Sequence, residues 1–154
     1  MSSPLHEAID LLESAEVACV TTLDAGGRPQ SRAMFNLRRV GQFPGLEPFF
    51  RPFRAGFETW FTTNTSSRKM ADIAGNPVAS VYYCRPGEWR GLMLGGDFEI
   101  IDDPAGKAAL WQEGWELYYP EGPTDPDYAV LRLKPTQVKY YSNLRTVVLA
   151  GQER

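Results

Sequence analysis

The sequence predicts a mainly β protein, an antiparallel barrel with short helices between its strands. About seven segments are rich in β-branched and aromatic residues, and most connections between them have the length of hairpin turns. Short strands joined in this way favour a barrel over a doubly wound parallel sheet. The 154 residues have room for one ordinary domain, so we expect a single domain over residues 1–154.

Residues 1–37 predict a helix followed by a β-hairpin. Ser3 and Pro4 are typical of the start of a helix, and the apolar residues after them recur at helical spacing. Residues 16–23 and 28–37 predict two strands, because both are β-rich and a turn of sequence Asp-Ala-Gly-Gly separates them.

Residues 39–56 do not continue this pattern. They contain three glycines, three prolines and four phenylalanines without a clear periodicity. So many aromatic side chains are not expected to stay in water, and we therefore predict an ordered surface loop, inserted between two strands.

The rest of the chain predicts five more strands and two helices. Paired glycines inside a strand usually mark a bulge or a bend at a barrel corner, and Gly95-Gly96 stand inside the longest predicted strand. Strands are expected at residues 59–63, 78–84, 89–101, 128–133 and 136–141, helices at 66–74 and about 104–113, and a C-terminal tail at 142–154.

Charge is unevenly distributed along the chain, although the formal net charge is −3. Residues 28–57 hold six arginines and one acid, whereas residues 97–127 hold nine acids and one base. The acidic stretch argues against a nucleic-acid partner, and a compact basic region on an acidic protein favours a small anion as ligand.

Composition excludes several classes of protein. No apolar run approaches the roughly 20 residues that a membrane span needs, so we expect no membrane contact. The acidic N-terminus does not resemble a signal peptide, and Cys19 and Cys84 therefore indicate reduced thiols in a cytoplasmic protein. With His6 as the one histidine, the chain has too few side chains for a zinc site or a Ser-His-Asp triad.

A strand end and a helix start meet in the segment from Thr62 to Lys69. Hydroxyl and amide side chains end the strand, and a helix capped by Ser66 would hold Arg68 and Lys69 in its first turn. Cations there oppose the helix macrodipole by about 0.3–1 kcal/mol each. A bound phosphate would remove this conflict, whereas the alternative is two solvated cations on a surface helix.

Arg32 would supply a third cation to the same anion. It lies in a predicted strand, where an arginine points either to solvent or into the barrel mouth. Three hydrogen bonds to a charged phosphate would contribute about 5–9 kcal/mol before ordering costs. Micromolar affinity needs about 8 kcal/mol, so a flat apolar ring attached to the phosphate should supply the difference.

These residues resemble the phosphate-binding segment of the pyridoxamine 5'-phosphate oxidase-like family of FMN-binding split barrels. The similar stretches are Thr62-Thr63-Asn64-Thr65-Ser66-Ser67-Arg68-Lys69, then Asn76-Pro77, and Ser31-Arg32-Ala33-Met34, which resembles the arginine-bearing FMN strand of that family. Residues 118–132 look like the general-stress-protein branch, and the resemblance spans roughly residues 5–141.

The resemblance implies an antiparallel split β-barrel with FMN as its cofactor. The residues that it assigns to the phosphate are Arg32, Ser67, Arg68 and Lys69. The residues that it assigns to the rest of the cofactor are Ala33, Met34, Thr62, Thr63 and Asn64, with the two threonines against the flavin ring or the ribityl chain. Members of the family are typically homodimers with FMN in the interface, so a second copy should complete each site.

Three departures from the true oxidases argue against oxidation of pyridoxamine phosphate. Leu37 stands where those enzymes carry a lysine, and Gly91 where they carry a glutamine. Their C-terminal tryptophan and arginine elements have no clear counterpart after Tyr141. We therefore expect a different small-molecule substrate.

Two further pairs of residues have structural interpretations. Trp111 and Trp115 could stack on a flavin, but aromatic residues at helical spacing more often pack in a core or an interface. Asp97 and Glu99 share one face of a strand and could act as acid and base, but we expect them to face solvent.

The hypothesis that follows is a flavin-dependent oxidoreductase in which FMN carries the redox chemistry. No side chain is singled out as a catalytic acid or base, and this fits a non-catalytic flavin-binding or stress-response module equally well. A third hypothesis keeps the fold but uses a deazaflavin or a haem. Haem is disfavoured because His6 is the single histidine of the sequence.

Overall fold

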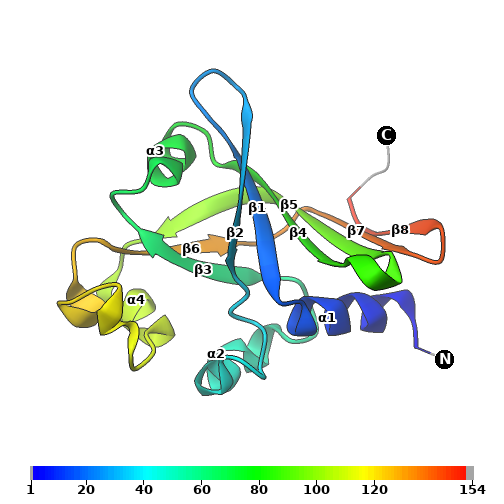
Figure 1. Cartoon of the computed structure of the whole chain (residues 1–154), viewed down its shortest axis with the longest axis horizontal. Coiled ribbons are helices and arrows are strands. Elements are labelled where there is room, and N and C mark those ends of the chain that lie inside the picture. Colours follow the sequence, from blue (N-terminus) through cyan, green and yellow to red (C-terminus); the bar gives the residue numbers. More distant parts are fainter. Residues whose placement is uncertain (1, 152–154) are drawn as a thin grey trace.

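The chain forms an antiparallel sheet that curls into a half-barrel, with short helices around it (Figure 1). The structure is a computed structural model that describes residues 2–151. Its strands are β1 (Val17–Leu23), β2 (Pro29–Phe35), β3 (Thr59–Asn64), β4 (Val78–Arg85), β5 (Arg90–Ile101), β6 (Tyr128–Leu133), β7 (Gln137–Ser142) and β8 (Arg145–Ala150). Its α-helices are α1 (Pro4–Ser14), α2 (Glu47–Phe50), α3 (Arg68–Gly75) and α4 (Pro104–Leu110).

The strand order explains how the sheet closes. The order is β2-β1-β4-β5-β6-β3, while β7 pairs with β5 and with β8. β1 and β2 form the predicted hairpin, in which Val17 lies opposite Phe35. Since β2 and β3 are the two ends of this order and also contact each other, the curl of the sheet brings residues 29–35 beside residues 59–64.

The bend predicted at Gly95-Gly96 is the point where β5 changes partners. On one edge of β5, residues 91–95 pair with β7, and residues 98–101 pair with β6. A side chain on Gly96 would have its Cβ 3.2 Å from the Lys134 carbonyl oxygen, so the glycine permits the close crossing of the chain between β6 and β7.

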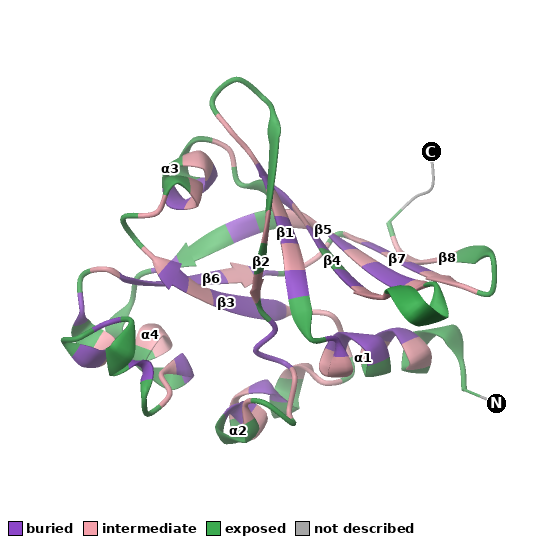
Figure 2. Ribbon diagram, viewed as in Figure 1, coloured by how far each residue is buried: buried purple, intermediate pink, exposed green. Residues whose placement is uncertain are grey.

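The inner face of the barrel holds the larger hydrophobic core. Alternate residues of the strands point inward, as the period of two requires, and Figure 2 shows the buried positions in purple along β1 and β4. The apolar face of α1 covers one end of this core through Ala8, Leu11 and Leu12, which are fully buried. Ser3 caps α1, as predicted, and accepts a hydrogen bond from the amide of His6.

A second core covers the outer face of β3 and β6. Trp60 of β3 and Val130 of β6 belong to it, together with buried residues of the inserted segment and of residues 110–119. Phe49 and Phe53 of the insertion pack against the Trp60 ring, with ring centroids 5.1 and 6.2 Å apart. The insertion is therefore ordered, as predicted, although it contains α2 and two short 3-10 turns rather than a plain loop.

Arg38 fastens both ends of the insertion to α1. Its guanidinium is 1% exposed and forms an ion pair with Glu13 at 3.1 Å. The same guanidinium donates to the carbonyl oxygens of Gly56 at 2.8 Å and Glu58 at 3.1 Å. A buried charge with this many partners has a structural role, and Arg38 is removed from the set of cations that could hold a small anion.

Several predicted boundaries are corrected by the structure. The expected tail at 142–154 contains β8, which pairs with β7, while residues 152–154 lie outside the described residues. The helix expected at 66–74 begins at Arg68, with Ser67 rather than Ser66 as its N-cap. The helix expected to reach about residue 113 ends at Leu110, where Trp111 takes an extended conformation. None of the helices in residues 2–151 has the length and hydropathy that a membrane crossing requires.

Candidate functional site

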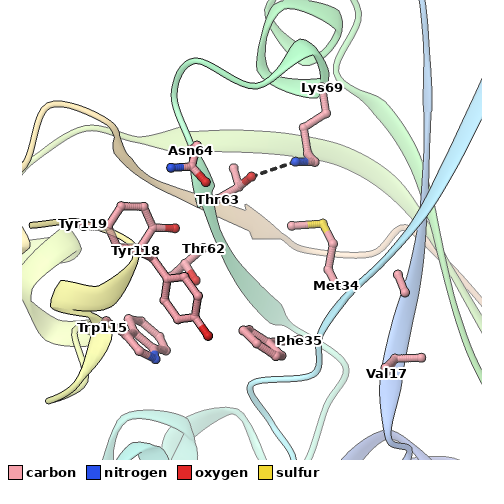
Figure 3. A pocket seen from close by; sticks show the side chains of 11 residues that line it. Val17, Met34, Phe35, Thr62, Thr63, Asn64, Lys69, Trp115, Tyr118 and Tyr119 are labelled. Carbon is pink, nitrogen blue, oxygen red and sulfur yellow. Dashed lines mark hydrogen bonds between the residues drawn. The ribbon is translucent and has the colours of Figure 1, made fainter.

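A pocket of about 380 Å³ opens where β2 meets β3 (Figure 3). Strand β3 forms its floor, β2 one side, the start of α3 one end, and residues 115–119 the opposite wall. The lining residues are Val17, Ala33, Met34, Phe35, Thr62, Thr63, Asn64, Lys69, Trp115, Tyr118 and Tyr119. The set includes six of the nine predicted cofactor-binding residues.

Lys69 supplies the positive charge of this pocket. Its ammonium donates a hydrogen bond to Thr63 Oγ1 at 2.9 Å, and Figure 3 shows it reaching from α3 toward β3. Burial lowers the pKa of Lys69, and the positive charge of Arg32 lowers this pKa further. A bound anion would relieve the repulsion that Arg32 exerts on the charged form of Lys69.

Arg32 lies on β2, immediately beside the pocket wall. Its guanidinium donates to Thr22 Oγ1 at 2.7 Å, and the side chain is half-buried instead of solvated. Burial lowers the pKa of Arg32, and the negative charge of Asp72 partly offsets this decrease. The sequence left Arg32 with two possible orientations, and the structure selects the one toward the barrel.

The start of α3 offers unpaired hydrogen-bonding groups at the same end of the pocket. Ser67 occupies the N-cap position, yet its hydroxyl makes no capping bond. Ser67 Oγ is buried and has no hydrogen-bond partner among the described residues. The first N–H groups of a helix also have no partner within the helix, and here they belong to Arg68 and Lys69. Buried polar atoms without partners are rare and call for a ligand or a water.

Arg68 takes a different direction from Lys69. It is exposed and does not line the pocket. Its charge contributes to lowering the pKa of Asp24, after the larger effect of the hydrogen bond from the amide of Arg28. The Arg68 side chain therefore lies within electrostatic range of the turn of the β1–β2 hairpin.

An aromatic wall closes the pocket opposite Lys69. Trp115, Tyr118 and Tyr119 come from the chain after α4, and Figure 3 shows them grouped on one side of β3. Phe43 of the insertion packs against the rings of Phe35 and Trp115, with centroids 5.8 and 6.4 Å apart. The insertion thus packs against two of the residues that line the pocket.

The two tryptophans of the predicted pair have different positions. Trp115 lines the pocket, whereas Trp111 packs edge to face on Tyr128 in the second core, at 5.2 Å between ring centroids. The spacing of the pair was visible in the sequence. The contributions of Tyr118, Tyr119 and Phe35 were not, because no local pattern places them beside β3.

The other candidate groups lie away from the pocket. Glu99 pairs with Arg132 on the neighbouring strand, and Asp103 caps α4 by accepting from the amide of Gly106. Within residues 2–151, no cluster of three or more His, Cys, Asp or Glu side chains could hold a metal ion. Both cysteines are free and half-buried in strands.

The basic stretch at residues 28–57 is not a single anion-binding surface, contrary to the prediction. Arg38 is buried in its ion pair with Glu13, and Arg51 and Arg54 both pair with Glu47. Arg32 is the member of this stretch that lies beside the pocket. Nearness in sequence grouped these cations, but the fold separates them.

Fold and site together define a split-barrel protein with a cationic pocket between β2 and β3. The family model for pyridoxamine 5'-phosphate oxidase matches residues 5–142, so the chain belongs to this family. A search of curated proteins found no significant match.

Solved structures of similar proteins confirm the split-barrel fold. A Clostridium acetobutylicum protein related to general stress protein 26 of Bacillus subtilis is 32% identical, with a TM-score of 0.75 over 95% of this chain and 93% of that one. General stress protein 26 from Bacillus anthracis is 19% identical, with a TM-score of 0.68 over 96% and 100% of the two chains. An FMN-binding protein from Nostoc punctiforme, related to pyridoxamine 5'-phosphate oxidase, is 22% identical, with a TM-score of 0.59 over 89% and 79%.

Proposed function

We propose that the protein binds FMN, with the phosphate at the start of α3 and the ring in the pocket between β2 and β3. One observation carries this proposal. A buried Ser67 hydroxyl without a hydrogen-bond partner stands two residues before Lys69, a cation that is close enough to Arg32 for their charges to interact. Hydroxyl, ammonium and guanidinium groups at a helix N-terminus suit a phosphate. The apolar remainder of the pocket suits a flat ring.

The residues present fit the parts of this cofactor. Lys69, Arg32 and Ser67 would hold the phosphate, and Arg68, which is exposed outside the pocket, would add positive charge near it. Thr62 and Thr63 of β3 would lie along the ribityl chain and ring, and Met34 on β2 would face them across the pocket. Bound FMN would supply two-electron redox chemistry.

The proposal is tested by titrating the purified protein with FMN, riboflavin and a deazaflavin while recording the visible spectrum. We expect saturable FMN binding and much weaker binding of riboflavin, which shares the ring but lacks the phosphate. Riboflavin binding as tight as FMN binding would contradict a phosphate site, and the absence of any flavin binding would contradict the proposed function.

FMN affinity is expected to fall with rising pH, and to do so before an exposed lysine would lose its proton. Burial and the charge of Arg32 lower the pKa of Lys69, so this ammonium loses its proton at a lower pH than an exposed lysine does. A neutral amine binds phosphate more weakly. Kd values for FMN and riboflavin between pH 7 and 10 should diverge in the wild type and stay parallel in Lys69→Arg. Parallel curves in the wild type would contradict the assignment of Lys69.

We further propose that the protein is an oxidoreductase that acts on a small molecule other than pyridoxamine phosphate. Membership of an oxidase family supports the reaction class. Reduction of the FMN-loaded protein by NADH or NADPH, followed by reoxidation with candidate acceptors, tests turnover. A bound flavin that no donor reduces would favour the non-catalytic module instead.

The same titration separates FMN from a deazaflavin. An F420 reductase shares the fold, and so does a haem-binding protein from Mycobacterium smegmatis. No histidine lines the pocket among the described residues, and His6 lies exposed on α1, which disfavours haem. A deazaflavin that binds more tightly than FMN would reassign the cofactor.

A second copy of the chain is proposed as the partner that completes the pocket. Val17, Phe35, Val78 and Tyr82 are large apolar residues, 41–49% exposed, on one face of β2, β1 and β4. Val17 and Phe35 also line the pocket, so this apolar face continues into its rim.

Sedimentation should give a mass of twice 17.3 kDa for the wild type. Val78→Asp should shift the mass toward the monomer, and a monomeric wild type would contradict the proposal.

A further inference from the structure

The carboxylate of Asp127 fastens the turn that leads from β3 into α3. Its Oδ2 accepts a hydrogen bond from Asn64 Nδ2 at 2.7 Å, and its Oδ1 accepts one from the amide of Ser66 at 2.8 Å. The backbone oxygen of Asp127 accepts from the amide of Thr65, also at 2.8 Å. Three consecutive residues of the turn are therefore held by one residue that precedes β6.

This turn sets the position of the candidate phosphate site. The amide of Ser67 donates to the carbonyl oxygen of Asn64 at 3.0 Å, so the N-cap of α3 follows directly from the fastened turn. Ser67 carries the unpartnered hydroxyl, and Lys69 stands two residues further on. A displacement of the turn would move both groups relative to β2 and Arg32.

Asp125 links the same turn to the aromatic wall. This buried carboxylate accepts from the amide of Asp127 at 2.9 Å and from the amide of Glu121 at 3.0 Å. Residues 121–127 continue from Tyr118 and Tyr119, which line the opposite wall of the pocket. The amide of Gly122 donates to the carbonyl oxygen of Tyr119 at 3.0 Å, so hydrogen bonds within this segment connect the cationic end of the pocket to the aromatic end.

The chemistry of Asp127 matches a positioning role. Its hydrogen bonds lower its pKa, that from the amide of Ser66 most strongly, so the carboxylate stays ionised at neutral pH. Both carboxylate oxygens accept hydrogen bonds from the turn, so Asp127 is engaged in holding the turn rather than in contacting a ligand. Neither Asp127 nor Asp125 lines the pocket.

We propose that Asp127 is the positioning residue for the phosphate-binding turn, and that Asp125 couples this turn to the aromatic wall. The inference rests on the proposed function, since the ligand that the turn would hold is the FMN phosphate. Asp127 acts through Asn64 and Ser66 and does not touch the ligand itself.

An exchange of the two interacting side chains tests the proposal. Asn64→Asp sets two carboxylates against each other and should raise the Kd for FMN by about 10–100-fold, the cost of losing a hydrogen bond to a charged group. The double variant Asn64→Asp with Asp127→Asn reverses the pair. The new amide can donate to position 64 and accept from the Ser66 amide, so the Kd should return to within about threefold of wild type.

Two further measurements distinguish positioning from a general loss of structure. The Kd for riboflavin should change by less than about threefold in Asp127→Ala, in which the Kd for FMN rises, because Asp127 does not line the pocket and the ring site keeps its lining residues. Hydrogen exchange of a peptide covering residues 64–70 should accelerate in cofactor-free Asn64→Asp and return to the wild-type rate in the double variant. Asp102→Asn removes an exposed acid outside the site and serves as the charge control, with unchanged affinity.

Three results would overturn the positioning role. They are an unchanged FMN affinity in Asn64→Asp, an equal loss of FMN and riboflavin affinity in Asp127→Ala, and a double variant no better than Asn64→Asp alone. Wild-type protein that binds neither FMN nor riboflavin would overturn the proposed function and, with it, the positioning role. Wild-type protein that binds FMN while Asn64→Asp binds it equally well overturns the positioning role alone.

Discussion

Replacing Arg32 and Lys69 together by alanine is expected to weaken FMN binding by about 10²–10⁴-fold. Each side chain would donate a hydrogen bond to the phosphate dianion, and hydrogen bonds to charged groups contribute about 1.5–3 kcal/mol each. Two of them correspond to about 3–6 kcal/mol, and each 1.4 kcal/mol is a tenfold change in Kd. Fluorescence titration with FMN measures the effect directly.

The matched control for this double variant is Arg28→Ala. Arg28 is an exposed arginine at the turn of the same hairpin, so its removal changes the charge of this region without touching the pocket. FMN affinity should stay within about threefold of wild type at moderate salt, where exposed charges are screened. Riboflavin affinity should be nearly unchanged in both variants. A loss of affinity in Arg28→Ala as large as in the double variant would indicate long-range attraction rather than a phosphate site.

Arg38→Met is expected to destabilise the fold by about 3–5 kcal/mol, the cost of removing one partner of a buried ion pair. The substitution leaves the Gly56 and Glu58 carbonyl oxygens and the Glu13 carboxylate without their donor. For a protein of this size, thermal unfolding should shift downward by roughly 10 °C. Differential scanning calorimetry of the cofactor-free protein provides the measurement.

Arg51→Met is the control for that effect. Arg51 also forms an ion pair, with Glu47, but its side chain is 68% exposed, so its removal should leave the unfolding temperature unchanged. Below its own unfolding transition, Arg38→Met should bind FMN with an affinity close to wild type, because Arg38 does not line the pocket. A selective loss of FMN affinity in Arg38→Met would contradict this structural role and indicate that Arg38 takes part in anion binding.

The elements that the sequence predicted correctly are those specified by neighbouring residues. Ser3-Pro4 and the apolar spacing after them define α1, and the turn after Leu23 defines the first hairpin. Gly95-Gly96 marks the corner of β5, because a glycine is needed where the chain passes closely. Such signals act within a few residues, so they can be identified before any tertiary contact is known.

Predictions that depended on the ends of elements were less accurate. The predicted C-terminal tail at 142–154 is wrong for residues 145–150, which form β8 and pair with β7. α3 begins after Ser67 because the turn from residue 64 to 66 is held by Asp127. The sequence around Ser66 and Ser67 contains two possible caps, and a distant residue selects between them.

The candidate site itself divides in the same way. The sequence by itself determined the strand-to-helix segment from Thr62 to Lys69, its excess of hydroxyl and cationic groups, and hence the family. Only the tertiary structure decided that Lys69 lies close enough to Arg32 for their charges to interact, and that Arg38 is buried in an ion pair with Glu13. It also decided that Asp127 holds Asn64, which is 63 residues away in the sequence. Local propensity follows from each residue and its neighbours, whereas these contacts exist because the strand order brings β2, β3 and the approach to β6 together.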